Sequence, residues 1–338
     1  HYEVTVARKT VDATYMNVRV PSTTPPKYDV SPEATLVPLN DLVRVREPRD
    51  GYVIIGAGKT GIDAVLFLLR QGVDRKRITW IVSNDSWLME RAGLQPGITF
   101  RWFLQQIRIV AEAGSMNDVT RELEKQGVFC RIDESVNPVK FRCATVNREE
   151  LALLRQIDNV VRKGRVRRVE SGVVRLDGGS LETPGDVLYV DCTADPLAKR
   201  PAVPVFDGNR VTLQSVSMCQ QVFSASLIGY LESRYGDDAT RNALSRPVPH
   251  PEYIRDYIPA TWRTLANMDL WSRKFGRWMR TSRLAYSSHD SLWATLRYGL
   301  EARMLRERAF ANMQRLYEQE FPGDAPPVTK DEQIAAGA

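Results

Sequence analysis

The stretch Tyr52–Leu69 reads YVIIGAGKTGIDAVLFLL, and its centre is formed by Gly56, Ala57, Gly58, Lys59, Thr60 and Gly61. An apolar, strand-like run precedes this G-x-G-x-x-G motif, and a helix-like run follows it. In such a unit the first glycine permits a tight turn, the second lets the backbone approach a pyrophosphate, and the third allows close packing of helix on strand. The helix N-terminus favours the phosphate charge. The stretch therefore predicts a dinucleotide site; the alternative is a glycine turn that binds nothing.

The residues after this unit favour the same interpretation. Gly72 is placed to end the helix, and Arg77–Val82 reads as a second strand that is followed by Ser83, Asn84 and Asp85. A carboxylate at this strand end accepts hydrogen bonds from a ribose diol and repels a 2′-phosphate. Asp85 therefore favours NADH, whereas the cations Lys59, Arg91 and Arg101 leave NADPH open.

Composition sets broad limits on the class of protein. A chain of 338 residues with 43% hydrophobic residues can form two domains, and its net charge of +6 suits an anionic cofactor without requiring nucleic acid. The four cysteines form no C-x-x-C pair and there are three histidines, so we expect free thiols, no metal site and a cytoplasmic location. No apolar run is long enough to predict a membrane span.

The rest of the chain alternates between strand and helix patterns. We expect N-terminal strands over 2–6 and 10–16, helices over 100–125 and 147–163, and a β-meander over 165–179 that contains an Asp-Gly turn. Asp186–Ala194 reads as a buried strand that ends in small polar residues. Residues after 215 have mostly helical spacing.

Two features give the chain a family resemblance. The segment 56–91 resembles the NAD(P)H domain of flavin-dependent monooxygenases of the flavin-containing and Baeyer–Villiger type, because Trp87-x-x-x-Arg91 follows the glycine motif. Asp191-Cys192-Thr193-Ala194 is similar to the small-residue crossing that joins the two dinucleotide domains in that class. One departure is Asn84, which stands where the family places an arginine for the 2′-phosphate of NADP.

The resemblance implies an α/β fold in which a Rossmann-like NAD(P)-binding domain, residues 45–187, is inserted in an incomplete FAD-binding-like domain. Residues 1–44 would end the flavin-type domain and form a crossover linker. Residues 188–325 would complete that domain and add a mainly helical C-terminal region, and 326–338 would form a disordered tail. The flavin domain's own glycine motif, expected before the first strand, is absent from this chain.

The implied activity is hydride transfer from NAD(P)H to FAD and oxygenation of a small organic substrate. The alternative is a non-catalytic nucleotide-binding redox sensor, or degenerate flavoprotein, that acts through protein partners. No catalytic residue is assigned, and the sequence leaves a homo-oligomer open. The candidate cofactor-binding residues are Gly56, Ala57, Gly58, Lys59, Thr60, Gly61, Ser83, Asn84, Asp85, Arg91, Thr193 and Ala194.

One further segment, Trp271–Arg283, interleaves aromatic residues with cations and contains no acid. Its apolar residues recur at helical spacing. We expect a core-facing helix with a solvated arginine side; the alternative is a basic surface for nucleic acid, an anionic membrane or a partner.

Overall fold

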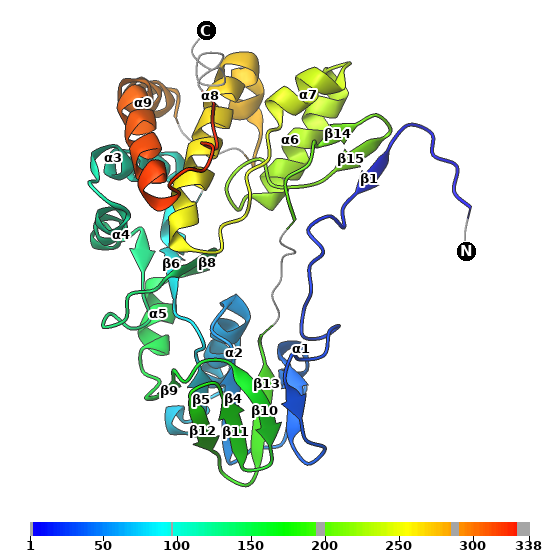
Figure 1. The fold of residues 1–338 in the computed structure, drawn as a ribbon, viewed down its shortest axis with the longest axis vertical. Coiled ribbons are helices and arrows are strands. Elements are labelled where there is room, and N and C mark those ends of the chain that lie inside the picture. The colour runs from blue at the N-terminus through cyan, green and yellow to red at the C-terminus, as the bar shows by residue number, and fades with distance from the viewer. Residues whose placement is uncertain (1–2, 96, 194–199, 285–290, 330–338) are drawn as a thin grey trace. The chain divides into compact units, whose positions relative to one another are not determined.

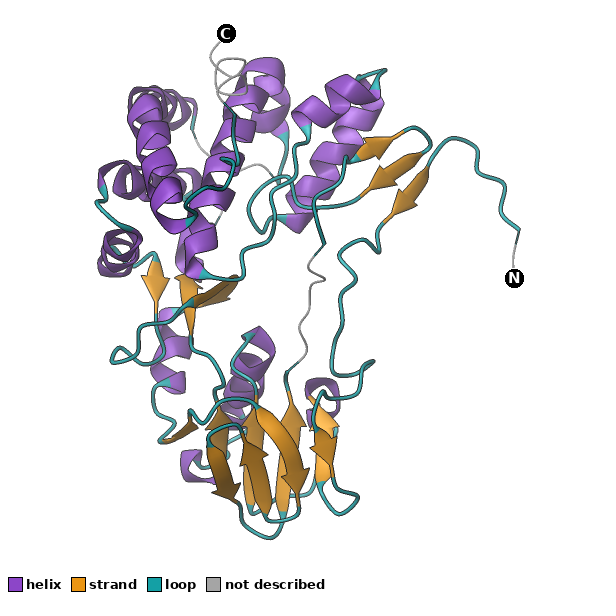
Figure 2. Cartoon of the chain, viewed as in Figure 1, coloured by secondary structure: helices purple, strands orange, loops and turns teal. Residues whose placement is uncertain are grey.

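The computed structural model describes residues 3–95, 97–193, 200–284 and 291–329, and the chain forms two compact units. Unit 1 comprises His1–Met16, Arg91–Phe129 and Lys199–Ala338, and unit 2 comprises Asn17–Glu90 and Cys130–Ala198. Helices predominate in unit 1 and strands in unit 2 (Figure 2). The protein is therefore a mixed α/β protein, as predicted.

A five-stranded parallel sheet forms the centre of unit 2 (Figure 1). Every neighbouring pair in it is parallel. The strands, in spatial order, are β3 (Thr35–Pro38), β13 (Val187–Asp191), β4 (Gly51–Ile55), β5 (Ile78–Ile81) and β9 (Asn159–Val161). The chain runs from β4 to β5 in one direction, whereas β13 lies on the other side of β4. The strand order therefore reverses beside β4.

Both faces of this sheet are covered, so all five residues of β4 are buried. Tyr52 and Ile54 belong to a core with α2 (Lys59–Arg70), whereas Val53 and Ile55 belong to a core with the second sheet of the unit. This division follows from the alternation of side chains along a strand. The central strands consequently read as continuous apolar runs, which is typical of a parallel sheet buried on both sides.

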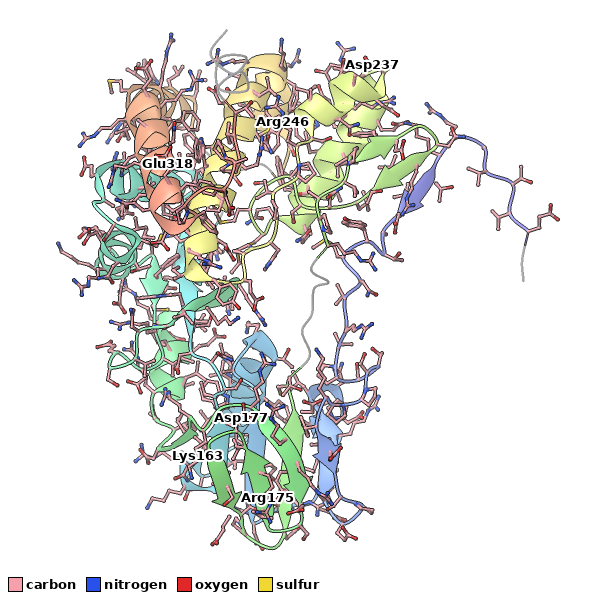
Figure 3. The ribbon with its side chains drawn as sticks, in the orientation of Figure 1. Lys163, Arg175, Asp177, Asp237, Arg246 and Glu318 are labelled. Carbon is pink, nitrogen blue, oxygen red and sulfur yellow. The ribbon has the colours of Figure 1, made fainter. Side chains whose placement is uncertain are left out.

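The second sheet of unit 2 contains the predicted meander. Asp177 accepts a hydrogen bond from the Arg165 amide (2.9 Å), and the adjacent Gly178 amide donates to the Lys163 carbonyl (2.9 Å), which fixes one end of the meander (Figure 3). Its strands, in spatial order, are β12 (Gly179–Glu182), β11 (Val173–Leu176), β10 (Val166–Glu170) and β2 (Asp29–Val30). The other elements of unit 2 are α1 (Leu39–Leu42), η1 (Arg75–Arg77), α5 (Arg148–Leu154) and the parallel pair β6 (Ser86–Glu90) and β8 (Lys140–Val146). The short strand β7 (Phe129–Cys130) contains the boundary between the units.

Unit 1 combines a small sheet with helices. The sheet consists of β1 (Thr10–Asp12), β15 (Arg210–Thr212) and β14 (Phe206–Asp207). The helical elements are η2 (Arg91–Leu94), α3 (Thr99–Glu112), α4 (Met116–Lys125), α6 (Gln221–Arg234), α7 (Asp238–Leu244), η3 (Ile254–Asp256), α8 (Tyr257–Thr281) and α9 (Leu292–Glu320).

Polar side chains of α9 secure the end of α3. The Asn312 amide donates to the carbonyls of Val110 (2.6 Å) and Ala113 (2.9 Å), and Arg315 donates to those of Ala113 (2.6 Å) and Gly114 (2.9 Å). Such donors satisfy carbonyls that lack partners within the helix, and the arginine charge complements the helix C-terminus. The C-terminal half of α9 is thereby fixed to α3.

Several predicted boundaries differ from the structure. Residues 3–6 form no strand, and the strand predicted over 10–16 is limited to β1. The helix predicted over 147–163 ends at Leu154, and Val160 and Val161 belong to β9 instead. The apolar residues of α5 and those of β9 happen to be spaced as in one continuous helix. In the predicted C-terminal tail, Val328 is buried, and residues 330–338 lie outside the described residues.

Among the described residues, none of the helices combines the length and the apolar composition that a membrane span requires.

Candidate functional site

The carboxyl ends of the five parallel strands lie in one row. In the register of the sheet Asp191 pairs with Pro38 and with Ile55, and Ile81 pairs with Ile55 and with Val161. The residues that follow these positions therefore share one edge of the sheet. In open α/β sheets ligands bind at this edge, where the strand order reverses. The candidate residues at 56–61, 83–85 and 193 follow β4, β5 and β13 at this edge.

The first and third glycines of the motif are each required by the backbone around them. Gly56 has φ +121°, and a Cβ there would lie 2.6 Å from the Cys192 carbonyl oxygen. A Cβ at Gly61 would lie 2.0 Å from the Gly56 carbonyl oxygen, which also accepts a buried hydrogen bond from Trp80 Nε1 (2.8 Å). Strand, turn and helix thus approach closely because both positions lack a side chain.

The second glycine lies in open space. Gly58 is the N-cap of α2, no described side chain caps this terminus, and no described atom lies within 4 Å of a Cβ built there. The amides of the first helical turn are therefore available to an anion, with the positive end of the helix dipole behind them. Lys59 forms an ion pair with Asp63 one turn along, so its charge is partly neutralised.

Asp85, the candidate ribose acceptor, is bound by a cation that the sequence had not indicated. Arg162, the residue after β9, donates to both carboxylate oxygens of Asp85 (2.9 and 3.1 Å) and lies 3.2 Å from Asp133. Its hydrogen bond to Asp85 is the main cause that raises the pKa of Arg162. The pKa of Asp133 is lowered, chiefly by the Ser135 hydroxyl. One cation between two carboxylates leaves this cluster with a net charge of −1.

The end of β13 is fixed by a buried carboxylate. Asp191 is 3% exposed and accepts hydrogen bonds from the Thr193 amide (3.0 Å) and hydroxyl (2.7 Å). Between them, Cys192 is buried, and burial raises the pKa of its thiol. Cys130 and Cys192 are free thiols, whereas Cys143 and Cys219 are not, so the prediction of four free thiols is wrong for two of them.

Not every predicted site residue can be assigned to this edge. Ser83 and Asn84 follow β5 and their side chains lie 3.5 Å apart, but Arg91 begins η2 in unit 1. Ala194 lies outside the described residues. Trp87 is 2% exposed, with the Arg131 guanidinium 5.1 Å from its ring centre, and so is a packing residue.

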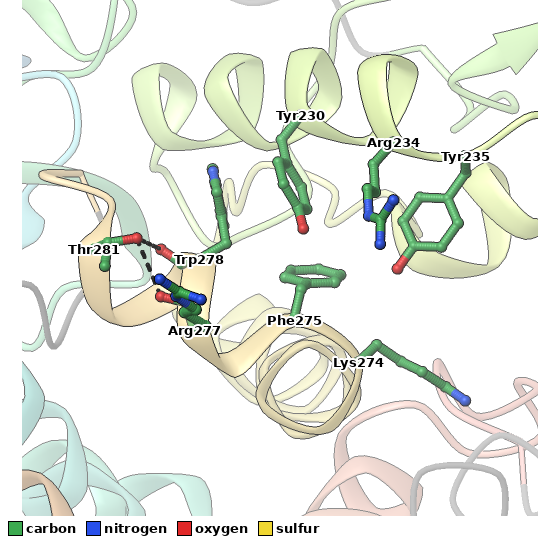
Figure 4. A pocket seen from close by; sticks show the side chains of 8 residues that line it. All are labelled: Tyr230, Arg234, Tyr235, Lys274, Phe275, Arg277, Trp278 and Thr281. Carbon is green, nitrogen blue, oxygen red and sulfur yellow. Dashed lines mark hydrogen bonds between the residues drawn. The ribbon is translucent and has the colours of Figure 1, made fainter.

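Residues 271–281 of the basic aromatic segment form the end of α8. Trp271, Phe275 and Met279 are buried, as expected for a core-facing helix. Trp278 stacks on Tyr230 of α6, with ring centres 4.6 Å apart, and the two rings line a cavity of about 650 Å³ (Figure 4). The aromatic residues of the segment therefore serve mainly in packing.

Arg162 and Trp80 were not predicted as residues of this edge, although the sequence contains a weak indication of each. Arg162 follows Val160-Val161, and a strand assignment for that pair would have placed it at the carboxyl edge. Trp80 lies in the predicted second strand, where it was counted only as an apolar residue. Its indole hydrogen bond to Gly56 depends on the direction of the side chain in the folded state, which the sequence does not give.

Comparison with known proteins supports no functional assignment. No family model matches the chain. The uncharacterized proteins Rv2000 of Mycobacterium tuberculosis (strain ATCC 25618 / H37Rv) and Mb2023 of Mycobacterium bovis are each 45% identical to it over 290 residues, which cover 84% of this chain and 54% of theirs. The chain thus spans about half the length of these curated relatives.

Proposed function

We propose that unit 2 is a Rossmann-like domain that binds a pyridine dinucleotide at the carboxyl edge of its parallel sheet, and that the protein is an NAD(P)H-dependent oxidoreductase resembling flavin-dependent monooxygenases. The observation that carries the proposal is the division of roles among the three glycines. Gly56 and Gly61 are required by their backbone neighbours, whereas Gly58 is exposed to open space at the N-terminus of α2. Glycine also suits an N-cap, and the open space beside it leaves room for a diphosphate.

Two features at this edge support a dinucleotide. The first turn of α2 offers amide donors for a diphosphate, and the absence of a side chain at Gly58 allows close approach. Thr193, held by Asp191, presents a short side chain on the neighbouring strand end. The nicotinamide would supply the hydride, while these residues bind and orient the cofactor.

The cluster of Asp85, Arg162 and Asp133 supports NADH as the preferred cofactor. A 2′-phosphate would meet the Asp85 carboxylate, and the cation beside it, Arg162, is already hydrogen-bonded to that carboxylate. A ribose diol can instead share the Asp85 oxygens, each of which has a further lone pair. FAD as acceptor, oxygenation of a small organic substrate and a cytoplasmic location stay predictions that rest on the family resemblance.

The decisive experiment is a titration of the purified chain with NADH and with NADPH, in which tryptophan fluorescence reports binding. Trp80 contacts the turn through its indole nitrogen and is therefore a reporter at the site. We expect saturable quenching by NADH at lower concentration than by NADPH. Gly58→Ala should weaken binding at least about tenfold, or ~1.4 kcal/mol. Gly229→Ala on α6, where a Cβ also meets no described atom within 4 Å, is the matched control.

Three outcomes separate the hypotheses. No saturable binding of either nucleotide refutes the site. Equal weakening by both glycine substitutions shows that the loss does not arise at the turn. Binding of NADH without its oxidation after FAD is added would instead support the non-catalytic sensor.

A further inference from the structure

A second cavity lies wholly within unit 1, between α3, α8 and α9. It has a volume of about 1040 Å³, in the range of ligand sites in proteins. Apolar residues from all three helices line it: Phe100, Phe103, Leu104 and Ile107 from α3, Leu265, Met268 and Met279 from α8, and Ala302, Ala309 and Phe310 from α9. An apolar lining of this kind suits an alkyl chain.

Arginines surround this apolar lining. Arg273 and Arg306 share Asp269, at 3.3 and 3.2 Å, so one carboxylate neutralises part of two cations. Arg277, Arg280 and Arg303 also line the cavity, and none of them forms an ion pair with a carboxylate in the described parts of the chain. Among the described residues of the lining, Glu307 is the one other acid, which gives five cations against two anions there.

The path of α8 sets the position of two of these cations. The helix is interrupted at Phe275, where φ is −149° and ψ is 42°, and Gly276 follows. Glycine beside a break in the hydrogen-bond ladder is a common cause of a helix kink. The kink changes the direction of the last turns, which carry Arg277 and Arg280 along the cavity, while Phe275 itself packs in the core on the α6 side.

We propose that this cavity binds a single-chain amphiphile with a carboxylate head, a molecule of the fatty-acid class. The alkyl chain would lie against the apolar lining, and the carboxylate would pair with Arg277, Arg280 and Arg303, which form no ion pair with a described carboxylate. Arginine suits this role because its planar group binds a carboxylate with two parallel hydrogen bonds. The inference is independent of the proposed function, since every residue that carries it belongs to unit 1.

A membrane surface is the competing ligand. On α9, the side chains of Leu292, Trp293, Leu296, Leu300 and Met304 are 58–82% exposed. An apolar stripe beside arginines can also bind an anionic bilayer. We favour the soluble amphiphile because the charged and apolar groups line one concave cavity between three helices, whereas a bilayer requires a convex or flat surface.

The test is calorimetric titration of the full chain with dodecanoate, dodecanol and butanoate below their aggregation concentrations. Dodecanoate should bind saturably, near one per chain. Dodecanol lacks the charge and butanoate lacks the chain, so each should bind at least about tenfold more weakly. Arg280→Gln and Arg303→Gln should weaken dodecanoate about tenfold and leave dodecanol unchanged.

Two further variants complete the design. Ala302→Trp should fill the cavity and abolish binding of both long-chain probes, with unchanged circular dichroism. The control is Arg308→Gln on the same helix, because Arg308 faces Glu112 and does not line the cavity. Equal affinity for dodecanol, loss of binding in the control, or association with phosphatidylglycerol vesicles without binding of monomeric dodecanoate would each overturn the proposal.

Discussion

The packing of Gly61 against the glycine turn makes a stringent prediction. In Gly61→Ala the new Cβ would lie 2.0 Å from the Gly56 carbonyl oxygen and 2.8 Å from its carbon, so α2 must move away from β4. Overpacking of this kind costs about 1–3 kcal/mol. The movement also strains the buried Trp80 hydrogen bond to the same oxygen, worth about 1–3 kcal/mol if it is lost. The better helix propensity of alanine returns at most about 1 kcal/mol. Together these terms give an expected loss of stability of about 1–5 kcal/mol.

The assay is equilibrium unfolding in urea, followed by circular dichroism and by tryptophan fluorescence. Gly58→Ala is the matched comparison, because its Cβ meets no described atom within 4 Å and only the N-cap preference changes, by about 1 kcal/mol or less. If Gly61→Ala unfolds at the same urea concentration as the unmodified chain, the close approach of α2 to the turn is wrong. If Gly58→Ala is the more destabilised of the two, the open space at Gly58 is wrong.

Four other predictions concern residues of unit 2. Asp85→Asn should release Arg162 and shift the ratio of NADH to NADPH affinity toward NADPH by about tenfold, which parallel titrations measure; an unchanged ratio would remove the cluster from cofactor choice. Burial raises the pKa of Cys192, so maleimide at pH 8 should label Cys130 but reach Cys192 only after denaturation, as mass spectrometry would show. The same shift means that stability linked to Cys192 is complete below the unfolded thiol pKa of roughly 8.5 and declines as the pH rises above it, a decline that Cys192→Ala should reduce. Asn147→Ala should remove the capping box of α5 and cost about 1 kcal/mol in unfolding experiments.

The sequence predicted the centre of unit 2 better than its borders. The run Tyr52–Ile55, the glycines and Arg77–Val82 specify strand, turn and helix by local rules, and the structure has β4, α2 and β5 there. The position of β13 beside β4 cannot be read locally, because it depends on pairing between distant segments. The sequence pattern predicted the buried strand itself, Asp186–Ala194, but not its place beside β4.

The sequence predicted the parts of the candidate site that depend on backbone geometry, but not the contacts between side chains. The spacing of the glycines identified the turn, because a position that cannot accommodate a Cβ is occupied by glycine. Asp85 was correctly placed after β5, but its pairing with Arg162 joins residues 77 apart. A short strand such as β9 has too few residues to show its own period, and so Arg162, the residue that follows it, was missed.

The late arrival of β13 has a consequence during protein synthesis. About 130 residues separate β4 from β13, and β13 fills the gap between β3 and β4. At ribosomal rates of roughly 5–20 residues per second, β4 would emerge about 7–30 s before its second neighbour. Throughout that interval one edge of an apolar strand in the nascent chain lacks its partner. Chaperone association with ribosome-bound chains should therefore be strongest before Val187–Asp191 leaves the exit tunnel, and should fall once that segment can pair.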